Sequence, residues 1–266
     1  MSNMQIVDDS DDERDSILII TGDVDFLRYF VYELKSQYRI LHALDGIEGM
    51  KKAKKSTPDI IILDVMMCGT DGLELCRNLK SDVVTSHIPI IILAITGGEE
   101  KEAEALEAGV DDFMVRSLCS RILKARIGNL LESRRKLRER FSHEVRLKPA
   151  DIVVTPSDEN FLHRTVEIIE AHMSDPEFKV ESFSRNMGLS RSQLFRKIKK
   201  LTSETPVYFI QTIRLRRAAQ LLEKSYLTVT EISYEVGFKY PSHFSQLFHS
   251  KFGQSPKEYR KRFLNQ

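Results

Sequence analysis

The sequence has no apolar run long enough to cross a membrane. Its longest apolar stretch, Ile88–Ile95, is far shorter than the roughly 18 residues that a span requires, and its N-terminus is acidic where a secretory signal is basic. Cysteine is also scarce. Cys68, Cys76 and Cys119 form no CxxC pair and are odd in number, which disfavours a disulfide framework or a zinc site. We therefore expect a cytoplasmic protein with reduced cysteines.

The formal net charge of +1 hides a strong asymmetry along the 266 residues. Residues 1–120 hold 12 basic and 23 acidic side chains, whereas residues 121–266 hold 28 basic and 16 acidic ones. The length suits two domains of ordinary size. A basic second half suits a polyanionic partner, although a solvated basic surface without a ligand has the same composition.

The first half alternates short apolar runs with amphipathic stretches. Residues 1–15 are mostly polar and acidic and predict a flexible lead. The expected strands are Ile17–Ile20, Ile60–Leu63, Ile88–Leu93 and a last one near Phe113–Val115, and the expected helices are Phe26–Leu34, Gly46–Lys54 and Gly72–Leu79. This alternation predicts an α/β doubly wound, five-stranded parallel sheet over residues 16–130.

Asp64 comes directly after the apolar run Ile60–Leu63, at the strand end where ligand chemistry belongs in such a sheet. The segments Leu63–Met67 and Asp71–Cys76, with Asp64 so placed, resemble the receiver domain of two-component response regulators over about residues 16–130. The resemblance implies that Asp64 is the phosphoryl acceptor. The alternative is an aspartate that only caps the following turn.

The sequence departs from the receiver pattern where that pattern holds Mg²⁺. Phosphorylation of an aspartate needs Mg²⁺, held by neighbouring carboxylates. The resemblance implies an acidic pair after the first strand, but this chain has Thr21 and Gly22 there, followed by Asp23. We therefore expect no resident cofactor, and at most a weak Mg²⁺ site at Asp23 and Asp64.

Three further receiver positions concern the switch. Ala94 stands where the resemblance implies a hydroxyl residue, with Thr96 two residues later, and Arg116 stands where it implies a lysine. Arginine keeps the charge but differs in reach and donor geometry. Phe113 matches the aromatic switch position. These departures predict a degenerate receiver that is phosphorylated weakly or not at all, and that serves for dimerisation or for docking a histidine kinase or another regulator.

The helical pattern continues from Ser120 to Phe141, with Leu123, Ile127, Leu130, Leu137 and Phe141 on a 4,3 spacing. A short dimer seam is one interpretation. The other, which we favour because fewer than four heptads are present, packs the first half on the sheet and leaves a basic linker over residues 131–157. Pro149 and Pro156 mark a boundary, after which a domain spans residues 158–266.

The C-terminal domain contains an internal repeat at an offset of 49 to 50 residues, which pairs Gly188 with Gly237 and Pro206 with Pro256. Each unit is predicted to be helix, turn, helix, and capping boxes begin at Ser190 and Thr228. The second helices place their apolar residues on one stripe: Leu194, Ile198 and Leu201, then Phe244, Phe248 and Phe252.

The opposite faces of these second helices carry side chains that bond base edges and phosphates in a major groove. The first face holds Arg191, Ser192, Gln193, Arg196, Lys197, Lys199 and Lys200, and the second holds Ser242, His243, Ser245, Gln246 and His249. We expect both helices to enter double-stranded DNA about one helical turn apart. A joining helix over Pro206–Lys224, with Arg214, Arg216 and Arg217, would fix their spacing.

The segments Ile232–Phe238 and Lys251–Gly253, with Ser255, Pro256, Tyr259 and Arg260, resemble the AraC-type transcription factor domain over about residues 160–263. Ser184 and Ser233 stand where alanine is usual, and Ser203 replaces a glycine. A receiver followed by this domain is similar to the C-terminal end of hybrid two-component regulators. The resemblance implies a free-standing transcription regulator or a remnant of a hybrid one, and not an enzyme.

Two other functions compete with this interpretation. A phosphotransfer or docking adaptor with an inert DNA-binding half would show active phosphorylation and no DNA complex. A metal-dependent phosphohydrolase would use Asp64 as a nucleophile, but it needs a carboxylate two residues on, where Met66 stands.

Overall fold

The computed structural model describes residues 14–65, 71–116, 120–143 and 155–264, and it divides into two compact units, residues 1–134 and 135–266. The first unit contains β1 (Ser16–Ile20), α1 (Val24–Leu34), β2 (Arg39–Ala43), α2 (Gly46–Ser56), β3 (Ile60–Asp64), α3 (Gly72–Ser81), β4 (Ile90–Ala94), α4 (Glu99–Glu107), β5 (Asp112–Val115) and the larger part of α5 (Ser120–His143), which continues past residue 134. None of the described helices is long and apolar enough to cross a membrane.

The five strands form one parallel sheet in the order β2-β1-β3-β4-β5, as expected for a doubly wound fold. Helices cover both faces, so every residue of β1, β3 and β4 is buried, which explains their continuous apolar runs. The strand β2 lies on one side of β1, and β3, β4 and β5 follow on the other side. The order in which strands are added therefore reverses between β1 and β3. The carboxyl ends of β1 and β3 therefore border the crevice in which such sheets bind ligands.

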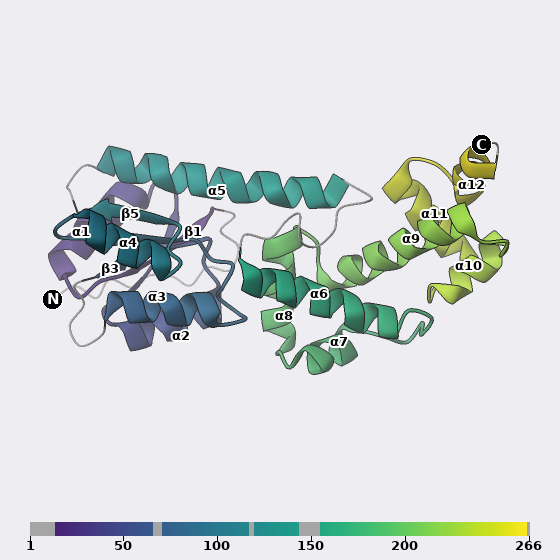
Figure 1. Ribbon diagram of the computed structural model, residues 1–266, viewed down its shortest axis with the longest axis horizontal. Coiled ribbons are helices and arrows are strands. Elements are labelled where there is room, and N and C mark those ends of the chain that lie inside the picture. Colours follow the sequence, from purple (N-terminus) through teal and green to yellow (C-terminus); the bar gives the residue numbers. More distant parts are fainter. Residues whose placement is uncertain (1–13, 66–70, 117–119, 144–154, 265–266) are drawn as a thin grey trace. The chain divides into compact units, whose positions relative to one another are not determined.

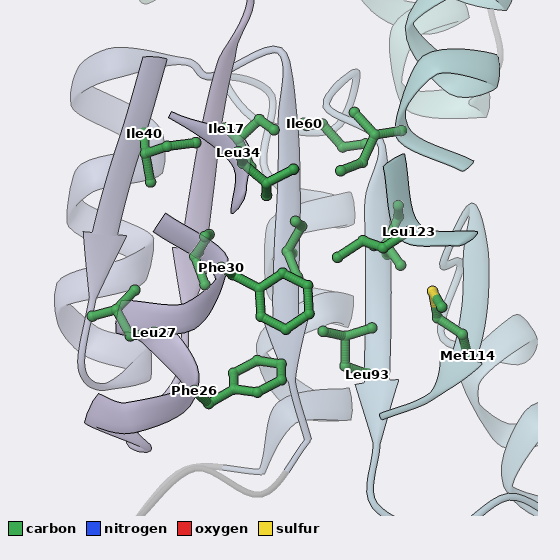
Figure 2. Packing of buried hydrophobic residues seen from close by; sticks show 14 of the residues in the cluster. Ile17, Phe26, Leu27, Phe30, Leu34, Ile40, Ile60, Leu93, Met114 and Leu123 are labelled. Carbon is green, nitrogen blue, oxygen red and sulfur yellow. The ribbon is translucent and has the colours of Figure 1, made fainter. Parts of the chain in front are cut away.

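Alternate strand residues belong to two cores on opposite faces of this sheet. Ile17 and Ile19 pack with α1 and α5, whereas Leu18 and Ile20 pack with α2, α3 and α4. Figure 2 shows the first of these cores, in which Phe26, Phe30 and other side chains of α1 cover the strands.

Cys76 of α3 lies in the second core. It is buried and donates to the carbonyl of Ala108 at 3.6 Å, and burial raises the pKa of its thiol to about 11. This is the packing role expected for it. Cys68 and Cys119 lie outside the described residues.

The helix α5 is continuous from Ser120 to His143, past the expected start of the linker at residue 131. Leu123 and Ile127 are buried against the sheet, so these two side chains are not available to a dimer seam. The side chains of Leu137 and Phe141 are outside the described part of the chain.

The second unit is all helical: α6 (Pro156–Ala171), α7 (Val180–Met187), α8 (Arg191–Thr202), α9 (Pro206–Lys224), α10 (Val229–Glu235), α11 (Pro241–Phe252) and α12 (Pro256–Leu264), shown in green to yellow in Figure 1. The predicted repeat is present. Ser190 and Thr228 form complete capping boxes at the starts of α8 and α10, and Gly188 and Gly237 have φ of 68° and 78° in the turns.

Candidate functional site

The candidate receiver site is centred on Asp64, the last residue of β3, whose side chain is 1% exposed. The hydroxyl of Thr21, which directly follows β1, donates to Oδ2 of Asp64 at 2.8 Å. Nη1 of Arg116, which directly follows β5, lies 3.5 Å from the same oxygen. The residues expected to differ from the receiver pattern are thus themselves the partners of the Asp64 carboxylate.

Arg116 also pairs through Nη2 with Asp23, so one guanidinium group bridges both candidate carboxylates. The guanidinium group stacks on the ring of Phe26, whose centroid lies 3.8 Å from the guanidinium carbon. Such stacking is a geometry that arginine adopts and lysine cannot reproduce.

Asp23 has a second, structural task as the N-cap of α1. Its carboxylate accepts the backbone amides of Asp25 and Phe26, each at 3.0 Å. The Phe26 amide and then the Arg116 side chain hold the pKa of Asp23 below its usual value, against a smaller effect of burial. The displacement by one residue from the expected acidic pair therefore leaves Asp23 capping a helix.

The carboxylates at this site fit Mg²⁺ poorly. Magnesium demands near-ideal octahedral oxygen coordination, whereas Asp23 and Asp64 share one guanidinium and Thr21 offers only a neutral oxygen. Within the described ranges, no group of three or more His, Cys, Asp or Glu side chains could hold a metal ion.

Two of the three switch positions line a small pocket of about 140 Å³ next to the same strand ends. Ala94 and Phe113 line it, together with Thr96. The Thr96 hydroxyl accepts a bond from Nζ of Lys101 at 2.7 Å, so its hydroxyl is directed to α4 and does not replace the missing one at Ala94.

The second candidate site comprises the outward faces of α8 and α11. Their apolar stripes are buried, Leu194, Ile198 and Leu201 in one core and Phe244 and Phe248 in another. Most of the residues expected to face a partner are exposed: Arg191, Ser192, Lys199, Ser242, His243, Gln246 and His249. Gln193, Arg196, Lys200 and Ser245 are half-buried.

Lys197 corrects the sequence interpretation. The sequence predicts it on the reading face, but its side chain is 0% exposed and pairs with Asp158 of α6 at 2.6 Å. The spacing could have shown this, because Lys197 lies three residues after Leu194 and four before Leu201 and so belongs to their buried stripe. A base contact by this side chain is excluded by its burial.

Some expected reading residues also bond within their own helix or its neighbour. Oε1 of Gln193 accepts the Ser190 amide at 3.0 Å in the capping box, and the Ser245 hydroxyl donates to the Pro241 carbonyl at 2.9 Å. Arg191 forms an exposed ion pair with Glu181 at 3.0 Å, and an exposed pair of this kind contributes little to stability.

The helix α9 joins the two helix-turn-helix units. Its first half packs in the core with α8 and its second half in the core with α11. Nη1 of Arg214 donates to the Gly237 carbonyl at 3.0 Å, and Nη2 to the Asp175 carbonyl at 2.5 Å. Lys251 of α11 pairs with Glu204, which precedes α9, at 3.1 Å. These buried and partly buried bonds connect α9 to the turn before α11, and α11 to the segment between α8 and α9.

Comparison with known proteins assigns both halves. Residues 17–127 match the response regulator receiver domain, and residues 183–262 match a helix-turn-helix domain family of the AraC type. Histidine kinase P4 of Formosa agariphila is 40% identical over 96% of this chain. The transcriptional regulatory protein AfsQ1 of Streptomyces coelicolor is 36% identical over 44% of it. A putative response regulator from Chloroflexus aurantiacus has a solved structure with 26% identity and a TM-score of 0.43, covering 45% of this chain and 99% of that one.

The chain spans 19% of the length of Histidine kinase P4 and 51% of AfsQ1. The domain assignments nevertheless agree with the fold, because the receiver match covers the parallel sheet and the helix-turn-helix match covers α7 to α12 for most of their length. The chain therefore combines a match to a receiver domain with a match to a helix-turn-helix domain.

Proposed function

We propose that this chain, which combines a response regulator receiver domain with an AraC-type helix-turn-helix domain, is a sequence-specific transcription regulator that reads DNA through α8 and α11. The observation that carries the proposal is the pair of exposed polar faces on these helices, Arg191, Ser192 and Lys199 on one and Gln246 and His249 on the other. The helix α8 packs in one hydrophobic core and α11 in another, and α9 contributes residues to both cores.

Footprinting of the full chain on the DNA flanking its own gene tests this function. We expect two protected half-sites about one helical turn apart. Gln246→Ala and Arg196→Ala should each weaken specific binding by roughly 1 to 3 kcal/mol if the side chain reaches a base. Unchanged gel-shift affinity for both variants would remove our assignment of the reading face.

We also propose that the receiver domain works without stable phosphorylation. The support is Arg116, whose guanidinium supplies a fixed positive charge between Asp64 and Asp23, where phosphorylation would require a metal ion. The domain then serves as a surface for dimerisation or for docking a histidine kinase or another regulator. The charge beside Asp64 comes from Arg116 and does not depend on a bound metal ion.

Incubation with a small-molecule phosphodonor and Mg²⁺, followed by intact-mass measurement, tests the receiver proposal. We expect little or no added phosphoryl mass on the wild type. Stoichiometric modification that Asp64→Asn abolishes would defeat the proposal.

A restored variant provides the matched positive control for this experiment. It combines Thr21→Asp, Gly22→Asp, Ala94→Thr and Arg116→Lys, which return the acidic pair, the hydroxyl and the lysine together. We expect this variant to gain phosphoryl mass under the same conditions, because metal ligands replace the guanidinium.

A further inference from the structure

One large apolar side chain lies on the reading face of α8. Phe195 is 41% exposed, whereas its apolar neighbours Leu194 and Ile198 are fully buried. Residues three or four apart share a helix face, so Phe195 lies between Ser192 on one side and Lys199 on the other. Nζ of Lys199 lies 5.8 Å from the centroid of its ring. The sequence interpretation named only the polar residues of this face.

The second unit has no such group at the equivalent place. In the repeat Phe195 corresponds to Ser245, which is half-buried and donates its hydroxyl to the Pro241 carbonyl. A single exposed aromatic on a protein surface is common and needs no explanation. An aromatic side chain in the middle of an otherwise polar and cationic reading face, and in one unit only, gives the two faces different chemistry.

The major groove presents one apolar group, the C5 methyl of thymine; its other exposed features are hydrogen-bond donors and acceptors. A phenyl ring set among cations that bind phosphates can cover that methyl and exclude water from it. We propose that Phe195 reads a thymine methyl in the half-site bound by α8. The inference rests on the proposed DNA-reading function and adds a specific base preference to it.

In vitro selection from a random duplex library, with the full chain at one salt concentration, tests the assignment. We expect the wild type to enrich a thymine at one position that Phe195→Ser no longer selects. Serine is the matched substitution because it is the residue of the second unit. Phe195→Leu, which keeps an apolar side chain, should retain the preference.

Uracil differs from thymine only by the missing methyl group and supplies the direct measurement. Replacing the selected thymine by uracil should lower wild-type affinity about three- to fivefold, the value expected for burial of one methyl group. The same replacement should leave the affinity of Phe195→Ser unchanged. Uracil placed at a thymine in the other half-site should affect both proteins equally.

The outcomes separate the two proposals. A selected sequence that Phe195→Ser does not alter, or an equal uracil effect in both proteins, overturns the role of Phe195 while DNA reading stands. Failure of the wild type to enrich any sequence overturns the DNA-reading function itself, and the base preference with it.

Discussion

Removing one member of the buried Lys197–Asp158 pair should destabilise the DNA-binding unit strongly. Both side chains are 0% exposed, and Nζ lies 2.6 Å from Oδ1 of Asp158. The hydroxyl of Thr155 donates to Oδ2 at 2.7 Å, and the ring centroid of Phe161 lies 5.0 Å from Nζ. The pair therefore connects the start of α6 to the middle of α8 in a site closed to water.

The magnitude follows from the geometry. At this distance the attraction is about 6 kcal/mol with an effective dielectric constant of about 20. Desolvation costs several kcal/mol per ion and offsets most of it. Lys197→Met or Asp158→Asn loses the attraction but leaves the other ion buried, so each should cost about 3 to 5 kcal/mol. The double variant Lys197→Met with Asp158→Leu removes both ions and should cost much less than the sum.

Hydrogen-exchange mass spectrometry of the full chain in increasing urea measures these effects separately for each unit. Peptides from α6 and α8 should lose protection in the single variants and regain it in the double variant. Peptides from β1 and β3 serve as the internal control and should not change. Single variants that cost less than about 1 kcal/mol, or a double variant as unstable as the sum, would refute the reasoning.

Three further results are expected. Gly237→Ala should cost at least about 2 kcal/mol in the same exchange experiment, because φ is +78° and the new Cβ would lie 2.3 Å from a backbone carbonyl oxygen; Gly188→Ala, with φ of +68° and open space, should cost less. Asp23→Asn should weaken the receiver fold at neutral pH, because the Phe26 amide and then Arg116 lower the pKa of Asp23, so its ionised carboxylate stabilises the folded state. This stabilisation is lost as the carboxylate is protonated. Urea unfolding at descending pH should therefore show the difference between wild type and variant vanishing as the pH falls through the lowered pKa. Lys199→Ala should reduce affinity for all DNA sequences and lower the salt slope of binding by about one, whereas a loss confined to one sequence would contradict a phosphate contact.

The elements that could be located from sequence are those with strong local patterns. The three buried strands, the helix α9 and both capping boxes agree with their expected positions because apolar runs, proline at a first helical turn and capping residues act locally. The sequence pattern does not locate the strand β2 or the helix α4. In β2 only Ile40 and Ala43 are buried, since it lies at the sheet edge, and α4 buries only Ala105.

The errors at the candidate sites concern long side chains. Lys197 has a charge typical of a DNA contact and a helical position typical of the core, and the presence of Asp158, 39 residues away along the chain, decides between them. The bridging role of Arg116 likewise depends on Asp23 and Asp64, which lie at the carboxyl ends of two different strands, β1 and β3.

By itself, the sequence determined the order of elements, the repeat, the division of charge between the halves and the departures around Asp64, because each is encoded in local spacing and composition. The tertiary structure alone decided which charges face outward and which neutralise one another. That outcome depends on the meeting of residues far apart in the chain, whose burial makes an unpaired charge costly and a pair permissible.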